Sequence, residues 1–166
     1  MSNFDFQALD KSFDRDTFDC GSEELNNFLK AKARQNQKAG SNRTFVAVKS
    51  DDSDKRVLGY YSLSMGEIDL SNLPEALRKK LPKHPVPIAR IGRLAVDKST
   101  QGQGLGKFIL VDAMKRVQTA SASVGVYALL VDAKDDQAKT FYKKYGFIEL
   151  VDEPMTLFLP LASFPD

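Results

Sequence analysis

Residues 92–117 read GRLAVDKSTQGQGLGKFILVDAMKRV, where glycines at 102, 104 and 106 separate an apolar strand-like run from an apolar helix-like run. Glycine-rich backbone between a strand and a helix leaves N–H groups unobstructed beside the positive end of the helix dipole. This junction suits an anion, and phosphate or pyrophosphate is the natural ligand. The glycines could instead only form a tight turn and let the helix pack closely on its strand, and the spacing alone leaves both interpretations open.

Two common phosphate-binding motifs do not fit the loop. A P-loop requires GxxxxGK[ST], which is absent here. A dinucleotide-binding turn requires GxGxxG directly after its strand, whereas these glycines alternate and begin several residues beyond Val96. Any phosphate site in this loop therefore follows another pattern.

The segments on both sides of the loop alternate between strand and helix periodicity. Ser22 stands at a helix N-cap position, and Gly40 follows the expected end of that helix. Alternating strands and helices predict an α/β domain with a mixed sheet. We expect strands at 4–10, 43–50, 56–70, 88–96, 126–133, 147–151 and 155–161, and helices at 22–39, 73–81, 104–118 and 135–145.

Composition indicates an ordinary globular protein. A chain of 166 residues suits one domain, and 42% hydrophobic residues can form a sizeable core. No run approaches the about 18 apolar residues of a membrane span, and the N-terminus lacks the apolar region of a secretory signal. With Cys20 as the single cysteine, we expect a reducing, cytoplasmic location and no membrane partner. No His/Cys/acid cluster has ligand spacing, so we expect no metal.

Two motifs together resemble a known family. Gln101-x-x-Gly104-x-Gly106 matches the [Q/R]-x-x-G-x-[G/A] signature of the GNAT superfamily of N-acetyltransferases, and AKTFYKKYGF at 138–147 resembles its A-x-x-F-Y-x-x-x-G-F motif. The resemblance implies one GNAT domain over residues 1–166, with a mixed, mostly antiparallel twisted sheet flanked by helices. It also implies acetyl-CoA as the cofactor.

A longer resemblance points to one branch of that family. It is carried by FDCGSEELNNFLKAKARQNQ (18–37), TFVAV (44–48), GYYSLS (59–64), PVPIARIGRLAVD (85–97) and DDQAKTFYKKYGF (135–147). These segments resemble the GNAT toxins of bacterial toxin–antitoxin pairs, of the TacT and AtaT kind. That branch implies acetylation of the amino group of aminoacyl-tRNA, which stops translation. It further implies a ribbon-helix-helix antitoxin, operator DNA bound only through that antitoxin, and a homodimer, which is common in the branch.

The resemblance also implies roles for individual residues of the cofactor site. Main-chain groups at the strand end would contact pantetheine, and loop amides with flanking side-chain donors would bind pyrophosphate. The family usually has asparagine where Asp135 stands. An aspartate has no amide group, so a contact of the amide type to the pantetheine is not expected at this position. The residues given cofactor-binding roles are Leu94, Ala95, Val96, Gln101, Gly102, Gln103, Gly104, Leu105, Gly106, Lys107, Asp135, Phe141 and Tyr145.

Tyr142 is the candidate catalytic residue. A phenol can return a proton to the departing thiolate of a thioester, and the family assigns this role to the tyrosine of its F-Y pair. Ala138, Phe141, Tyr142 and Tyr145 also stand at i, i+3, i+4 and i+7, the spacing of a buried helix face. The spacing allows core or catalysis equally, and the motif favours catalysis. We expect Phe141 and Tyr145 to pack and to line the cofactor.

The acceptor amine must be neutral to attack. A lysine amine has a pKa of about 10.4, whereas an α-amine has one of about 7.7–8.0, and the strand PIARIGRLAV carries no carboxylate to act as a base. This favours an α-amine, although Glu67 or a water chain could supply the base. A protein N-terminus, a lysine or a small amine stay open as acceptors, as does a non-catalytic acyl-CoA-binding module.

Basic side chains supply candidate contacts to RNA. Lys30, Arg34 and Lys38 recur every four residues opposite an apolar helix face and suit a phosphate backbone, although a solvated face has the same pattern. Lys32 points along the apolar side in a regular helix, where it either snorkels or reaches the acceptor. Arg90 and Arg93 lie in an expected central strand, so we expect them to face a cleft or to pair with acids.

Overall fold

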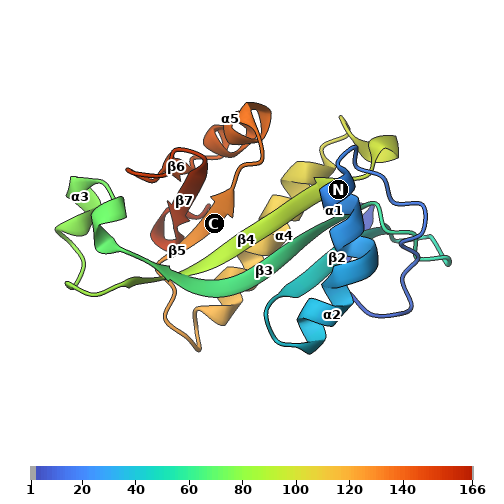
Figure 1. Ribbon diagram of the computed structural model, residues 1–166, viewed down its shortest axis with the longest axis horizontal. Helices are drawn as coiled ribbons and strands as arrows, with labels where there is room; N and C mark the ends of the chain where they lie inside the picture. The colour runs from blue at the N-terminus through green and yellow to red at the C-terminus, as the bar shows by residue number, and fades with distance from the viewer. Residues whose placement is uncertain (1–2, 166) are drawn as a thin grey trace. The chain divides into compact units, whose positions relative to one another are not determined.

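The computed structural model describes residues 3–165 (Figure 1). Strands and helices alternate along the chain, as the periodicity predicts. The elements are β1 Phe4–Ala8, α1 Glu23–Asn27, the π-helical turn η1 Phe28–Lys32, α2 Ala33–Lys38, β2 Arg43–Lys49, β3 Gly59–Ile68, the 3₁₀ turn η2 Leu70–Asn72, α3 Glu75–Arg78, β4 Val86–Val96, the 3₁₀ turn η3 Lys98–Thr100, α4 Leu105–Ala120, β5 Ala128–Asp132, α5 Asp136–Lys144, β6 Ile148–Glu149, β7 Thr156–Pro160 and the 3₁₀ turn η4 Leu161–Ser163.

Within residues 3–165 the strands form a seven-stranded sheet in the order β1-β2-β3-β4-β5-β7-β6. Strands β4 and β5 are parallel, while the pairs β1–β2, β2–β3, β5–β7 and β6–β7 are antiparallel. The predicted mixed, mostly antiparallel sheet is therefore confirmed. No helix in the described part of the chain is long and apolar enough to cross a membrane.

The chain divides into two compact units. One takes in the chain up to Ser64 together with Gly92–Ala113, and the other takes in Met65–Ile91 together with the chain from Met114. Strands β3 and β4 and helix α4 each contribute residues to both units.

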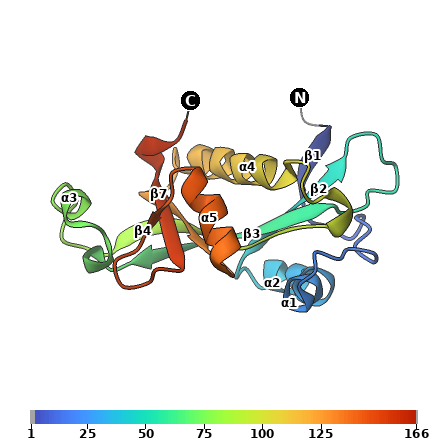
Figure 2. The same cartoon turned by 90° about the horizontal axis from the view of Figure 1, so that it is seen from above.

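In the first unit, neighbouring side chains of β3 point to opposite faces of the strand. Tyr60 faces the N-terminal helices, with its ring 5.6 Å from Phe18 and 6.1 Å from Phe28. Tyr61 faces α4, where its hydroxyl donates to Asp112 Oδ2 at 2.7 Å. Figure 2 shows α1 and α2 on one side of β3 and the start of α4 on the other.

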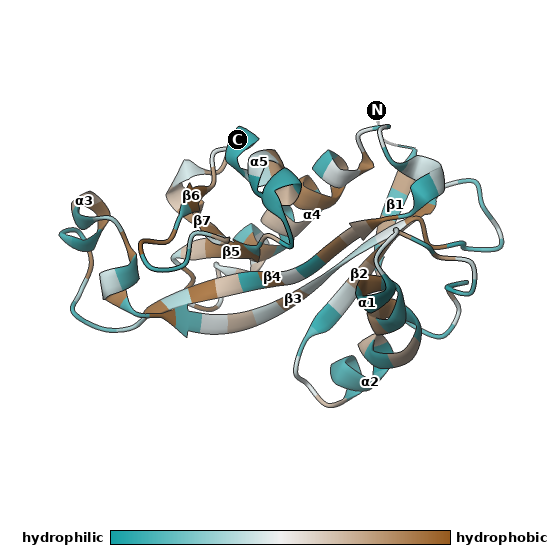
Figure 3. Ribbon diagram, turned by 45° about the horizontal axis from the view of Figure 1, so that its top comes forward, coloured by the Kyte–Doolittle hydropathy of each residue, from teal (hydrophilic) through white to brown (hydrophobic). Residues whose placement is uncertain are grey.

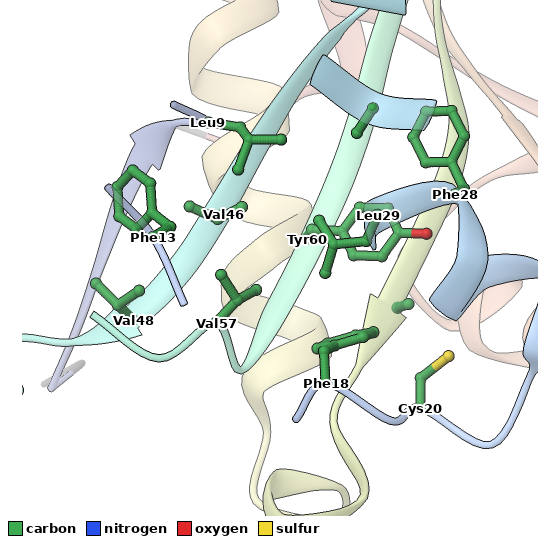
Figure 4. Packing of buried hydrophobic residues seen from close by; sticks show 12 residues of the cluster. Leu9, Phe13, Phe18, Cys20, Phe28, Leu29, Val46, Val48, Val57 and Tyr60 are labelled. Atoms are coloured by element: carbon green, nitrogen blue, oxygen red, sulfur yellow. The ribbon is translucent and has the colours of Figure 1, made fainter. Parts of the chain in front are cut away.

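The core between the sheet and the N-terminal helices is apolar and aromatic. Figure 4 shows Tyr60 at its centre, with Phe18 and Phe28 on either side. The Tyr60 hydroxyl donates to the Leu25 carbonyl at 2.6 Å, so the one polar atom of this side chain is satisfied. This packing fixes the first helix on the strands that lead into the glycine loop.

The first helix differs from the uninterrupted helix expected at 22–39. It begins at the predicted N-cap, Ser22, but widens to a π-helical turn over Phe28–Lys32, where the Ala33 N–H donates to the Phe28 carbonyl. In a continuous α-helix Lys32 would lie over Phe28, whereas the wider turn places the fully buried Ala33 there. Lys32 is consequently exposed, and the expectation that it points along the apolar side is wrong.

An arginine stabilises the widened turn. Arg15 Nη1 donates to the Leu29 carbonyl at 2.9 Å and to the Lys30 carbonyl at 3.4 Å. A widened turn disturbs the regular ladder of backbone hydrogen bonds, so a side-chain donor at these carbonyls offsets the cost. Arg15 lies fourteen residues before Leu29, and helical periodicity gives no sign of this contact.

In the second unit, β5 is the central strand. Arg90 on β4 lies opposite Leu130 on β5, and Asp132 at the end of β5 lies opposite Thr156 on β7. Residues Ala128 to Val131 are fully buried. The expected helix at 73–81 is shorter, because after Arg78 the chain tightens into turns in which the N–H groups of Lys80 and Leu81 donate to the carbonyls three residues earlier. The expected strand at 147–151 is reduced to Ile148–Glu149.

Candidate active site

The glycine loop adopts backbone conformations that favour glycine. Gly102 has φ +79° and Gly104 has φ +83°, and a Cβ added at either position would meet no atom within 4 Å. Close packing is therefore not what requires glycine at these two positions. The close approach is made by Gly59 on β3, where a Cβ would lie 2.7 Å from Ile109 Cδ1 of α4.

The start of α4 has the charge distribution of an anion site. The helix begins at Leu105, and its first turn contains Lys107 but no acidic side chain. Unpaired N–H groups of a first helical turn and the helix dipole both favour negative charge. Together with the open space around Gly104, this geometry accommodates a phosphate group.

Gln101 holds the loop in place. Its Nε2 donates to the Val96 carbonyl at 2.9 Å and to the Cys20 carbonyl at 3.1 Å. A primary amide has two N–H donors, so both are engaged. In this arrangement Gln101 positions the loop and offers no free donor to the pyrophosphate, in contrast to the flanking donor expected. Gln103 Nε2 likewise donates within the loop, to the Ser99 carbonyl at 3.2 Å.

Asp97 is a buried support of the loop that the sequence analysis did not identify. Its carboxylate accepts from the backbone N–H of Asp19 at 2.8 Å and of Ser99 at 3.0 Å, and it lies 3.6 Å from Arg56 Nη2. Burial alone raises the pKa of Asp97, but the hydrogen bond from the Ser99 hydroxyl, the two backbone hydrogen bonds and the arginine charge outweigh it and lower the pKa below its usual value. The local signal was present, because Asp97 is the N-cap of the 3₁₀ turn η3 and aspartate is a favoured residue at that position.

The same segment is tied to the start of the first helix. The Lys98 N–H donates to the Asp19 carbonyl at 2.8 Å, and Asp19 Oδ1 accepts from Gly21 N–H and from Asn26 Nδ2. The hydrogen bonds from Asn26 and Gly21 lower the pKa of Asp19. Cys20 packs in the core, as its position before a turn glycine suggests. The glycine loop and the N-terminus of α1 therefore form one hydrogen-bonded assembly.

The end of β4 leads directly into this assembly. Ala95 is buried, whereas Leu94 and Val96 are partly buried, and the Val96 carbonyl is the acceptor for Gln101. Arg93 packs on an aromatic ring of the first helix, and its position beside a cleft stays a prediction. Its guanidinium carbon lies 3.8 Å from the centre of the Phe28 ring, a cation–π contact that holds β4 against the first helix.

The basic residues of the first helix are all exposed. Lys30, Lys32, Arg34 and Lys38 lie on the outside of this segment. Figure 3 shows α2 coloured mainly as hydrophilic, which agrees with an exposed polar face. These four side chains are accessible to a polyanion, and their exposure is equally that of a solvated face.

Tyr142 is buried on α5 in the second unit, with 4% of its surface exposed. Its ring lies 5.4 Å from Phe141 and 5.6 Å from Phe147, and Phe141 lies 5.1 Å from Tyr145. Burial, and then the negative charge of Asp132, raise the pKa of Tyr142 well above its usual value of about 10. The phenol therefore keeps its proton throughout the physiological pH range. Phe141 and Tyr145 are partly buried and pack as predicted.

Arg90 lies beside an acidic residue of the neighbouring strand. Its Nη1 is 3.6 Å from Asp132 Oδ2, while Thr156 Oγ1 donates to Asp132 Oδ1 at 3.2 Å. Pairing of Arg90 with an acid was one of the two expected arrangements and is confirmed. Asp132 itself was not among the predicted site residues, because a single acid after an apolar strand has no motif of its own.

Asp135 caps α5. Its Oδ1 accepts the Ala138 N–H at 2.8 Å, the usual N-cap hydrogen bond. A capping role explains the carboxylate without any cofactor, and the cofactor contact stays a prediction. Glu67, the alternative base, is exposed. Among residues 3–165, no group of three His, Cys, Asp or Glu side chains could hold a metal ion.

Comparisons with known proteins agree with this geometry. The family model described as the Acetyltransferase (GNAT) domain matches residues 13–156. A tRNA-acetylating toxin from Mycobacterium tuberculosis is 36% identical over 143 residues, which cover 86% of this chain and 83% of that protein.

Two solved structures are also similar. AtaT complexed with acetyl-methionyl-tRNAfMet has a TM-score of 0.91 at 36% identity, covering 96% of each chain. A tyrosine-to-phenylalanine mutant of AtaT bound to the C-terminus of the antitoxin AtaR and acetyl-CoA has a TM-score of 0.84 at 33% identity, covering 98% of this chain and 96% of that chain.

Proposed function

This chain belongs to the GNAT family of acetyltransferases, and we propose that it acetylates the α-amino group of aminoacyl-tRNA and thereby blocks translation. The observation that carries the proposal is the 36% identity, over 86% of this chain, to a tRNA-acetylating toxin. An N-acetylated aminoacyl group has no free amine for peptide bond formation. The protein would therefore act as a toxin.

The residues of the glycine loop fit acetyl-CoA. Positive φ angles at Gly102 and Gly104, with open space where their side chains would be, leave backbone N–H groups accessible. We assign the pyrophosphate to the amides of Gln103, Gly104 and Gly106 with Lys107 beside them, and assign to Gln101 the task of holding the loop. When bound, acetyl-CoA supplies an activated acetyl thioester.

Tyr142 is the proposed general acid. Because burial raises the pKa of its phenol, the side chain stays protonated at neutral pH and can donate from Oη. A weaker acid is also a poorer donor, but a thiolate formed in a buried site is itself more basic than in water. The greater basicity of such a thiolate offsets part of the weaker acidity of the phenol.

The acceptor is proposed from the chemistry of the amine and from charge. An α-amine is substantially neutral near pH 7.5, so it needs less help from a base than a lysine does. The exposed Lys30, Arg34 and Lys38 supply positive charge for an RNA backbone. The β4 arginines are occupied differently, since Arg93 stacks on Phe28 and only Arg90 lies beside an acid.

A toxin of this kind requires a partner that restrains it. We propose a cognate antitoxin of the ribbon-helix-helix type, operator DNA bound only through that antitoxin, and a homodimeric toxin. The relative AtaT has been solved with the C-terminus of its antitoxin AtaR, which supports a protein partner for this chain. We also propose a cytoplasmic location, where charged tRNA is available as the acceptor.

The test is acetyl transfer from labelled acetyl-CoA to a pool of charged tRNA, with wild type beside Tyr142→Phe. With wild type, we expect label in the aminoacyl fraction. With the variant, we expect turnover to fall about 10²-fold or more while the affinity for acetyl-CoA stays unchanged. A variant as fast as wild type would refute the role of Tyr142. Wild-type label on protein or small amines and none on charged tRNA would refute the proposed acceptor.

A further inference from the structure

The proposed reaction lacks one group, a partner for the amine of the acceptor. Strand β4 carries no carboxylate in Val86–Val96, and Glu67 on β3 is an exposed residue near the strand end. The sheet, however, brings a carboxylate to β4 from the neighbouring strand. Asp132 ends β5 and lies beside Arg90 of β4 and Thr156 of β7.

The Asp132 carboxylate is held in place but has unused acceptor capacity. Thr156 Oγ1 donates to Oδ1 at 3.2 Å, and Arg90 Nη1 lies 3.6 Å from Oδ2, beyond the about 2.7–2.9 Å of a close charge-assisted hydrogen bond. A carboxylate has about four lone-pair positions, of which these contacts use at most two. The side chain is 38% exposed, so a ligand can reach it.

Three other carboxylates of the second unit are engaged elsewhere. Asp135 caps α5 through the Ala138 N–H, and Glu149 is paired with Lys139 and Lys143 at 2.9 and 3.2 Å. Asp69 accepts from Ser71 to cap a 3₁₀ turn. Asp132 differs because an accessible carboxylate stands at the end of a buried strand, four residues before α5 begins.

Asp132 also shares its surroundings with the proposed acid. Its negative charge contributes, after burial, to the raised pKa of Tyr142. Asp132 ends β5, and α5, which carries Tyr142, begins four residues later. An accessible carboxylate and a neutral proton donor match the two proton transfers that amide formation needs.

Resting on the proposed function, we infer that Asp132 is a catalytic residue, which accepts a hydrogen bond from the α-amino group of the acceptor and takes the proton that its nitrogen loses. The new N–C bond forms with the nitrogen electron pair, and the C–S bond breaks with its electron pair left on sulfur. Tyr142 gives its proton to that sulfur, and Asp132 receives the proton of the nitrogen. Transfer of this proton from Asp132 to the Tyr142 phenolate restores both groups, so the net change is one N–H exchanged for one S–H.

Arg90 is then a positioning residue. Its guanidinium lies on the Oδ2 side of Asp132 and Thr156 lies on the Oδ1 side, so the two contacts restrict rotation of the carboxylate. This arrangement uses a strand-borne arginine without requiring it to bind RNA. It also accounts for the charged side chain on an otherwise apolar part of β4.

The experiment compares Asp132→Asn with wild type on two acceptors, a pool of charged tRNA and a set of amino acid methyl esters. The asparagine keeps an oxygen for Thr156 but cannot take a proton, so kcat should fall about 10²-fold or more on both acceptors. Acetyl-CoA affinity by calorimetry should stay within twofold of wild type. Glu67→Gln is the matched control, with activity expected within twofold of wild type.

A second variant separates chemistry from folding. Asp132→Ala should be as slow as the asparagine variant and should regain part of its rate when formate is added, because a small carboxylate can occupy the vacated position. The inference would be overturned if either folded variant kept the wild-type rate, or if formate failed to rescue a folded alanine variant. It would also be overturned if the rate loss in Asp132→Asn were matched by a loss of acetyl-CoA affinity.

The two acceptors also separate this inference from the proposed function. Wild type that acetylates the methyl esters but not charged tRNA refutes the proposed acceptor, while the ester rates still decide the role of Asp132. Wild type that acetylates neither acceptor, with acetyl-CoA bound, overturns both.

Discussion

Replacing Gly104 by alanine should weaken acetyl-CoA binding much more than it destabilises the fold, and Gly102 offers a matched control. Both glycines have similar positive φ angles, +83° and +79°, and an added Cβ meets no atom within 4 Å at either. The two alanine variants therefore have the same backbone strain and no clash with the protein. Any difference between them in affinity reports on the ligand.

The expected magnitudes follow from this geometry. An alanine held in the left-handed region costs about 1–2 kcal/mol, which lowers the melting temperature by roughly 2–8 °C for a chain of this size. At Gly104 the methyl group would also stand where a phosphate approaches the backbone. Loss of one hydrogen bond to a charged group costs about 1.5–3 kcal/mol, so the Kd for acetyl-CoA should rise about 10- to 150-fold.

Calorimetry with acetyl-CoA and thermal unfolding of both variants provide the measurements. Gly102→Ala should share the loss in melting temperature but change the Kd less than about threefold, because we assign the pyrophosphate to the amides of Gln103, Gly104 and Gly106 and no longer to Gly102. Equal affinity losses in the two variants would show that strain alone disturbs the loop. Wild-type affinity in Gly104→Ala would refute the placement of pyrophosphate at this glycine.

Three further predictions concern the surroundings of the site. Asp97→Asn should lower the free energy of unfolding by about 1–3 kcal/mol at pH 7, measured in urea. Because the pKa of Asp97 is lowered in the folded state, this stabilisation is present above about pH 4 and is lost as pH falls through the folded-state pKa. The free energies of unfolding of variant and wild type should therefore converge in acid, and a difference that stays constant with pH would contradict this. Replacing Lys30, Arg34 and Lys38 together by glutamine should weaken tRNA binding and flatten its salt dependence, and an unchanged slope would leave them as a solvated face. Asp135→Ala should cost about 1 kcal/mol of stability while Asp135→Asn costs a few tenths, since asparagine also caps a helix; equal losses would argue against the cap.

The sequence by itself determined the features that depend on neighbouring residues. Strand and helix periodicity, the Ser22 cap and the position of the glycine loop between a strand and a helix are local properties, since each depends on a few consecutive residues. The two motifs also identified the family, because the glycine loop and the F-Y segment each lie in one continuous stretch. These predictions are confirmed by the fold and the family match.

Only the tertiary structure decided what individual polar side chains do. Gln101 donates to a carbonyl 81 residues away and Asp97 accepts from an N–H 78 residues away. The π-helical turn arises because packing on Phe28 favours a buried alanine over a lysine, against the regular helical period. Asp132 meets Arg90 because the sheet places β5 beside β4. The partners of such side chains are set by proximity and burial in the folded chain. The spacing of residues along the sequence predicts neither the proximity nor the burial.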